Sequence, residues 1–150
     1  MIEDITQEKE KEDALHRSEE RFRAIFENAA VGMAQVAPDG RWLRANRKVC
    51  EILGYSEEEL KNCDFQSLTH PEDLQEGLDL MEEMLSGERN SMHIEKRYIH
   101  KDGSVVWASL SVSCAHNQKG EVEYMISVID DITEKKQMRQ ELDASNTRFQ

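Results

Sequence analysis

Three extended segments follow one another near the end of the chain, with no helix between them. Residues 92–100, 104–115 and 121–130 alternate apolar and polar side chains, as strands with one buried face do. The connections between them, Lys-Asp-Gly and Asn-Gln-Lys-Gly, are glycine-containing hairpin signals. Because parallel neighbours would need a crossover connection, these three strands are predicted to form an antiparallel meander.

Two more strands and several short helices precede the meander. Residues 31–37 and 41–45 flank a Pro-Asp-Gly turn, in which proline fixes φ and glycine tolerates positive φ. Helices are predicted at 46–55, 56–61 and 69–88, the first with Asn46 as a candidate cap. This order predicts an α+β domain: a five-stranded antiparallel sheet with small helices on one face. The predicted buried stripe of the helix at 69–88 is Leu74, Leu78, Met81 and Leu85.

The two ends of the chain resemble each other. MIEDITQEK at residues 1–9 is nearly repeated as VIDDITEKK at 128–136. A repeat with so long a period does not indicate a solenoid, and it predicts one unit of a tandem array. We therefore predict three parts: an entry helix over 1–30 that carries the end of a preceding unit, a core over 31–130, and an exit helix over 131–150 that leads to a following domain.

Both end helices carry an apolar stripe at heptad-like spacing, which predicts pairing with a second copy of the chain. An ordinary amphipathic helix packed on its own domain is the alternative. The residues of the predicted dimer stripe are Leu15, Phe22, Ile25, Leu142 and Phe149.

Composition excludes several classes of function. The net charge is −12 and no segment is basic, so no nucleic-acid partner is predicted. The cysteine count is odd and no pair has C-x-x-C spacing, which argues against a disulfide framework or a zinc site. No apolar run approaches the ~20 residues of a membrane helix, and the start lacks signal-peptide features. A cytoplasmic segment without membrane contact is expected, whether or not the larger protein is anchored elsewhere.

Several motifs, in the right order, resemble a bacterial PAS domain of the S-box type. The resemblance is carried by SEERFRAIFENAAVGMAQVAPDGRWLRANRKVCEILGYSEEEL at 18–60, LTHPEDL at 68–74, HKDGSVVWASLSV at 100–112 and DITEKK at 131–136. It implies a PAS fold in a multidomain signalling protein with tandem PAS units, in which this unit senses or relays signals and dimerises. The output domain would be a histidine kinase, or a diguanylate cyclase or phosphodiesterase of cyclic di-GMP signalling.

The resemblance does not extend to the family's known cofactors. Blue-light members place a reactive cysteine in an Asn-Cys-Arg-Phe motif, whereas here Cys63 in Asn-Cys-Asp-Phe comes too early in the chain, and the flavin-binding asparagines have no counterpart. Haem-binding members have a histidine in the long helix, and residues 72–86 contain none. Neither flavin nor haem is therefore predicted, while an unidentified small metabolite stays open as a ligand.

No catalytic motif is present. The sequence lacks a glycine-rich phosphate loop, a paired-histidine metal motif, a nucleophile motif, cyclase and phosphodiesterase signatures and a phospho-acceptor histidine box. We predict neither catalytic residues nor a metal site in this segment, so that any enzymatic output lies in another part of the larger protein.

Strand alternation and the PAS resemblance predict a pocket between the sheet and the helices. Small side chains at Ala34, Ala108 and Ser127 would leave room for a ligand, although the same residues would also suit an ordinary packed core. The candidate pocket residues are Ala34, Val36, Cys50, Phe65, Leu74, Leu78, Met81, Tyr98, Ala108, Leu110, Met125, Ser127 and Ile129. The candidate signal-transmission residues are Trp107, on the outer sheet face, and Asp131, Ile132 and Thr133.

Overall fold

The computed structural model describes the backbone of residues 2–148 and the side chains of residues 8–142. The predicted α+β class with five antiparallel strands is confirmed. The elements in chain order are α1 (Ile2–Asn28), β1 (Gly32–Val36), β2 (Trp42–Ala45), α2 (Arg47–Leu53), α3 (Glu57–Lys61), α4 (Phe65–Leu68), α5 (Pro71–Leu85), β3 (Ser91–Ile99), β4 (Val105–His116), β5 (Val122–Asp131) and α6 (Thr133–Arg148).

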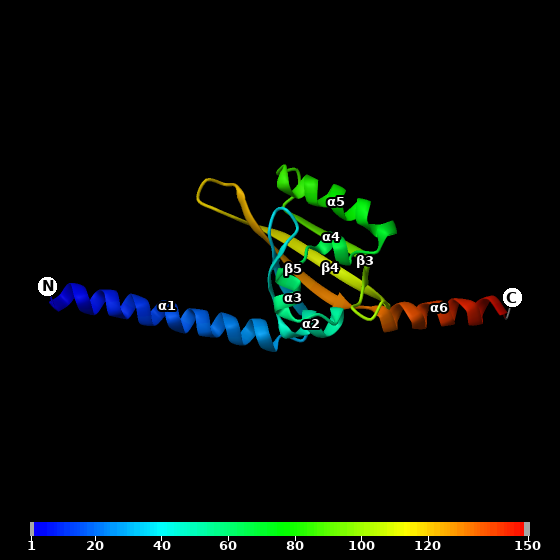
Figure 1. Ribbon diagram of the computed structural model, residues 1–150, viewed down its shortest axis with the longest axis horizontal. Coiled ribbons are helices and arrows are strands. Elements are labelled where there is room, and N and C mark those ends of the chain that lie inside the picture. The colour runs from blue at the N-terminus through cyan, green and yellow to red at the C-terminus, as the bar shows by residue number, and fades with distance from the viewer. Residues whose placement is uncertain (1, 149–150) are drawn as a thin grey trace.

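The strands lie in the order β2-β1-β5-β4-β3, and every neighbouring pair is antiparallel. The meander β3-β4-β5 therefore forms three adjacent strands of the sheet. Strand β1 pairs with β5 on one side and with the edge strand β2 on the other. Figure 1 shows α2 to α5 on one face of the sheet, while α1 and α6 leave the domain at opposite ends. The hydrophobic core lies between the sheet and the short helices.

Local signals account for the helix ends. Asn46 caps α2 by accepting from the Val49 N–H, and Gly54 ends that helix with a left-handed φ of +80°. Ser56 and Glu59 form a capping box at α3. The four-residue helix α4 is absent from the prediction, and it begins where the Asp64 side chain accepts from the Ser67 N–H.

The buried face of α5 differs from the predicted one. Gly77, Met81 and Met84 are buried, whereas Leu85, which was predicted to be buried, is 39% exposed. At about 100° per residue, Met81 and Met84 lie within about 40° of Gly77 around the helix axis, whereas Leu85 lies about 80° from it and is left near solvent. Leu74 and Leu78 flank this face and are half-buried.

Two glycines give a matched test of this packing. We expect Gly77→Ala to raise the free energy of unfolding by about 0.5–1 kcal/mol, because glycine weakens a helix interior and an added Cβ would meet its nearest atom, Lys96 Nζ, at 3.8 Å. We expect Gly54→Ala to lower it, because φ is positive there and the Cβ would lie 2.3 Å from the His100 ring. Urea denaturation measures both. A loss of stability in Gly77→Ala as large as that in Gly54→Ala would contradict the described packing.

Candidate functional site

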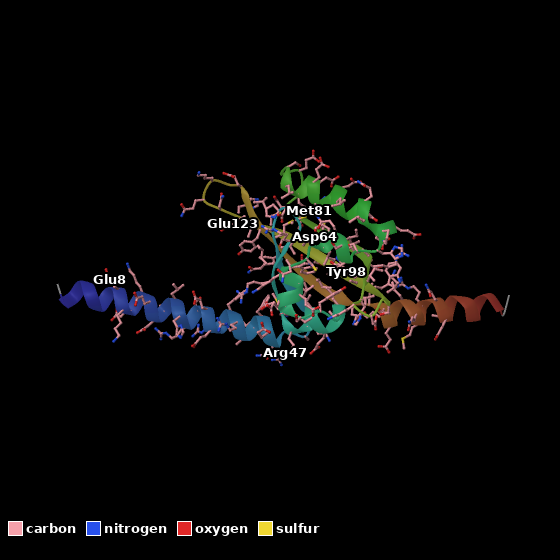
Figure 2. All side chains as sticks on the ribbon, viewed as in Figure 1. Glu8, Arg47, Asp64, Met81, Tyr98 and Glu123 are labelled. Carbon is pink, nitrogen blue, oxygen red and sulfur yellow. The ribbon has the colours of Figure 1, made fainter. Side chains whose placement is uncertain are left out.

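A small cavity lies between the inner face of the sheet and α5. Its volume is about 30 Å³, where a single water needs roughly 10–15 Å³. Met81 of α5 and Tyr98 of β3, both labelled in Figure 2, line it from the helix and from the sheet. The lining residues are Val36, Trp42, Phe65, Gly77, Met81, Met92, Ile94, Lys96, Tyr98, Leu110, Val112, Met125 and Ser127.

The cavity brings together about half of the predicted pocket residues. Those that line it are Val36, Phe65, Met81, Tyr98, Leu110, Met125 and Ser127. Ala34, Ala108 and Ile129 lie in the packed core outside the lining, so the two alanines do not supply its space. Cys50, Leu74 and Leu78 are half-buried and also lie outside the lining.

A buried lysine in the lining is absent from the predicted set. Lys96 is 2% exposed, and its Nζ lies 4.6 Å from the centroid of the Phe65 ring and 4.7 Å from that of the Tyr98 ring. The Nζ donates a hydrogen bond to Thr69 Oγ1 at 3.2 Å. Burial lowers the pKa of Lys96 to about 8, and the negative charge of Asp73 opposes that shift.

A sequence signal for Lys96 does exist. The alternation of β3 places Ile94, Lys96 and Tyr98 on one face, and all three are buried. Lysine is rarely fully buried unless it is paired with an acidic group, so a lysine at an inward position of a strand is uncommon. A charged side chain at an inward position of β3 is therefore a signal in the sequence for this site.

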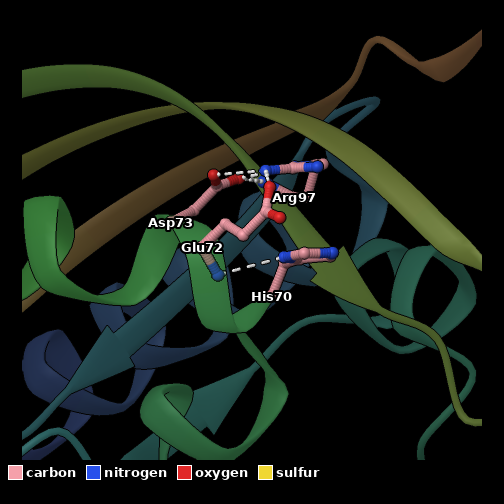
Figure 3. A network of polar contacts seen from close by, with 4 residues as sticks. All are labelled: His70, Glu72, Asp73 and Arg97. Carbon is pink, nitrogen blue, oxygen red and sulfur yellow. Dashed lines mark hydrogen bonds and ion pairs between the residues drawn. The ribbon is translucent and has the colours of Figure 1, made fainter.

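The acidic group whose charge acts on Lys96 is already engaged by another residue. Asp73 accepts from Arg97 through both carboxylate oxygens, from Nη2 at 2.8 Å and from Nε at 3.0 Å (Figure 3). The Arg97 backbone N–H also donates to Asp73, at 2.8 Å. Arg97 holds the pKa of Asp73 below its ordinary value, so this carboxylate serves Arg97 rather than Lys96. Among the residues with described side chains, no carboxylate lies within ion-pair distance of Lys96.

The Trp42 indole is a second polar group in the lining. The Trp42 indole N–H is buried, and within residues 8–142 it has no hydrogen-bond acceptor. Leaving such a donor unsatisfied costs about 1–3 kcal/mol. Tyr98 adds a phenol whose pKa is raised by burial, so it stays neutral. As far as the chain is described, the lining is therefore mostly apolar, with one cation and one unsatisfied donor.

The predicted transmission residues meet where the sheet joins the exit helix. The Trp107 backbone N–H donates to Thr133 Oγ1 at 3.0 Å, and the Trp107 carbonyl accepts from the Ile132 N–H at 2.9 Å. Asp131 accepts from the Thr133 N–H at 2.9 Å. On the outer sheet face, Lys136 of α6 lies 4.8 Å from the centroid of the Trp107 ring. Lys136 Nζ also forms an ion pair with the carboxylate of Glu95 in β3, at 2.8 Å.

The entry helix is held by a side chain assigned from the sequence only as a cap. Asn46 is fully buried, and its amide nitrogen donates to the carbonyls of Phe26 at 2.7 Å and Val31 at 3.2 Å. Its carbonyl oxygen accepts from the N–H groups of Met33 at 3.0 Å and Val49 at 3.1 Å. One amide therefore connects α1, β1 and α2.

The predicted dimer stripe is exposed where it is described. Leu15, Ile25 and Leu142 are more than 60% exposed, and Phe22, which stacks on the buried Phe26, is 40% exposed. Phe149 lies outside the described residues. Within the described part of the chain, no helix is long and apolar enough to cross a membrane, and no group of His, Cys, Asp and Glu is placed to hold a metal ion.

Comparison with known proteins agrees with this architecture. The family model described as the PAS fold matches residues 20–132. The chain is 45% identical over 126 residues to a probable diguanylate cyclase, DgcE, of Escherichia coli, and 34% identical over 129 residues to the sensor histidine kinase TmoS of Ectopseudomonas mendocina. These matches cover 84% and 86% of the chain, but only 11% and 13% of the two relatives. A solved PAS domain from Colwellia psychrerythraea superimposes with a TM-score of 0.70 at 17% identity, covering 77% of this chain and 97% of that one.

Proposed function

The chain belongs to the PAS family of sensory signalling modules, and from this premise we propose that it relays a signal from its entry helix or its core to its exit helix. The catalytic output would be made by another domain of a larger protein, a diguanylate cyclase or a histidine kinase. The module would work in the cytoplasm as a homodimer, paired through α1 and α6, next to further PAS units.

One observation supports the relay above the others. The backbone N–H and carbonyl of Trp107 in β4 are hydrogen-bonded to Thr133, the first residue of α6, and to Ile132 just before it. A shift of β4 would therefore act directly on the first turn of the exit helix. Such a switch requires a signal that stabilises one of two arrangements more than the other.

Thr133→Val tests the junction with a side chain of the same shape. The change removes the acceptor of the Trp107 N–H, so we expect a loss of about 1 kcal/mol in stability and a severalfold change in output. Output is measured as cyclic di-GMP synthesis by a fusion that joins α6 to a diguanylate cyclase domain.

A matched control lies at the opposite end of β4. Asn117 accepts from the N–H groups of Lys119 and Glu121 in the β4–β5 hairpin. Asn117→Ala removes comparable hydrogen bonds far from α6, and its output should equal that of the unmodified fusion. An equal change in output from both variants, or no change from Thr133→Val, would count against the relay.

A second function, a small-molecule sensor, is favoured by the cavity around Lys96. A buried cation without a carboxylate partner in the described structure is a costly feature for a core that serves packing alone. Native mass spectrometry of the purified chain reports oligomer and bound mass together. A dimer without added mass would support the relay alone, whereas a reproducible added mass of metabolite size would support the sensor.

A further inference from the structure

We propose that the cavity binds a short-chain carboxylate, with its charged group held by Lys96 Nζ and the Trp42 indole N–H. The inference rests on the second proposed function, in which the cavity is occupied. It adds to that function the chemical class of the ligand and the groups that recognise it.

The charge of the cavity is the first argument. The ammonium group of Lys96 has three N–H donors, and among the described residues Thr69 is its one hydrogen-bond acceptor. The Phe65 and Tyr98 rings stabilise the cation through their faces but carry no negative charge. Asp73 is engaged by Arg97. An anion inside the cavity would supply the missing counter-charge and accept from the remaining donors.

The donor pattern is the second argument. An indole N–H can only donate, and that of Trp42 has no acceptor in the described part of the chain. Lys96 and Trp42 line the same cavity, so both call for a ligand that accepts hydrogen bonds. A carboxylate has two accepting oxygens, and Ser127 adds a hydroxyl group to the same lining.

Size and polarity define the rest of the ligand. Among the residues with described side chains, Lys96 is the one charged group in the lining, so a second anionic group on the ligand would have no partner there. The other walls are mainly apolar, and the volume of about 30 Å³ holds only about two or three waters, so the alkyl chain must be short and its entry must enlarge the cavity. Met81, Met92 and Met125 can adjust their side chains to such a chain.

The test compares sodium propionate with propionamide, its uncharged isostere, and with sodium chloride at equal ionic strength. The chain has two tryptophans, so a Trp107→Phe background makes Trp42 the reporter of the cavity. We expect propionate to change the Trp42 fluorescence saturably and to raise the melting temperature. Propionamide should bind at least tenfold more weakly, and chloride should have no effect.

Two lysine variants make the test specific. Lys96→Met should weaken propionate binding at least tenfold. Lys101→Met should leave binding unchanged, because Lys101 lies over the Tyr55 ring at the surface and pairs with Glu59. Equal binding of propionate and propionamide, binding retained in Lys96→Met, or the same response to chloride would overturn the proposal.

The failure of this inference can be told apart from failure of the sensor function. A bound neutral metabolite in native mass spectra, together with no response to propionate, would leave the sensor standing and refute the carboxylate class. No bound mass and no saturable response to propionate would refute both.

Discussion

Replacing Asn46 with alanine is expected to lower the free energy of unfolding by about 3–5 kcal/mol. The change removes four hydrogen bonds made by one fully buried amide. Each buried backbone group left without a partner costs about 1–3 kcal/mol, and water that enters the gap recovers part of this sum. Few single substitutions reach such a value, and those that do break a buried network.

Urea denaturation at neutral pH measures the loss, with Ser56→Ala as the matched control. Ser56 also caps a helix, but it lies at the surface, so its removal should cost about 1 kcal/mol. Hydrogen exchange adds a local readout: in Asn46→Ala the last turn of α1 should lose protection before the sheet does, because the Phe26 carbonyl no longer receives its bond. A loss no larger than that of Ser56→Ala would show that Asn46 is only a cap.

The connection through Asn46 also bears on signalling. A relay needs the entry helix to be attached to the core, so that a movement of α1 reaches the sheet. Asn46 bonds to the carbonyl of Phe26 and to the N–H of Met33 in β1. Strand β1 pairs with β5, which ends at Asp131, two residues before α6 begins. The entry helix α1 and the exit helix α6 are thus connected through the Asn46 side chain and through the backbone hydrogen bonds between β1 and β5.

The sequence was sufficient for the parts of the fold that depend on local chemistry. Hairpin turns with glycine and alternating strands define the meander from neighbouring residues alone. The face of α5 was assigned less well, because Met84 and Leu85 are both apolar and only tertiary contact decides which is buried. The short helix α4 has one capping bond from Asp64 and too few residues for a periodic pattern.

The candidate site was harder to predict for the same reason. Tyr98 and Ser127 follow from strand alternation, but alternation cannot tell a lining residue from a core residue such as Ala108. Asn46 matched the pattern of a cap, and its bonds to the end of α1 join residues distant in sequence. The alternation of β3 places Lys96 on the buried face, but a charged side chain is normally found at the surface, so Lys96 is absent from the predicted pocket.

Lys96→Met is expected to raise the free energy of unfolding by about 1–3 kcal/mol near neutral pH. The native pKa of Lys96 is about 8, against an ordinary value of 10.5, so folding disfavours its charged form. Each unit of difference corresponds to about 1.4 kcal/mol at pH values below both pKa values. Loss of the bond to Thr69 and of the contacts with two rings offsets part of this gain.

The sign of the pH dependence follows from the protons bound. Between the two pKa values the unfolded chain holds a proton on Lys96 that the folded chain has released, so this group makes stability rise with pH. Its cost is complete below about pH 8 and disappears as the pH passes the unfolded value near 10.5. The stability gap between Lys96→Met and the unmodified chain should therefore narrow by about 2 kcal/mol from pH 7.5 to pH 9.5.

Denaturation of the two proteins in parallel isolates this group. Burial raises the pKa values of Cys50 and Cys114, and these groups titrate in both proteins, so their effects cancel in the difference. Lys101→Met is the control, because the hydrogen bond with Glu59 raises the pKa of Lys101 and the gap should not narrow in the same way. A stability difference between Lys96→Met and the unmodified chain that stays constant over the same pH interval would mean that the Lys96 ammonium is stabilised as well in the folded chain as in water. The cavity would then have no unmet charge for a carboxylate to balance.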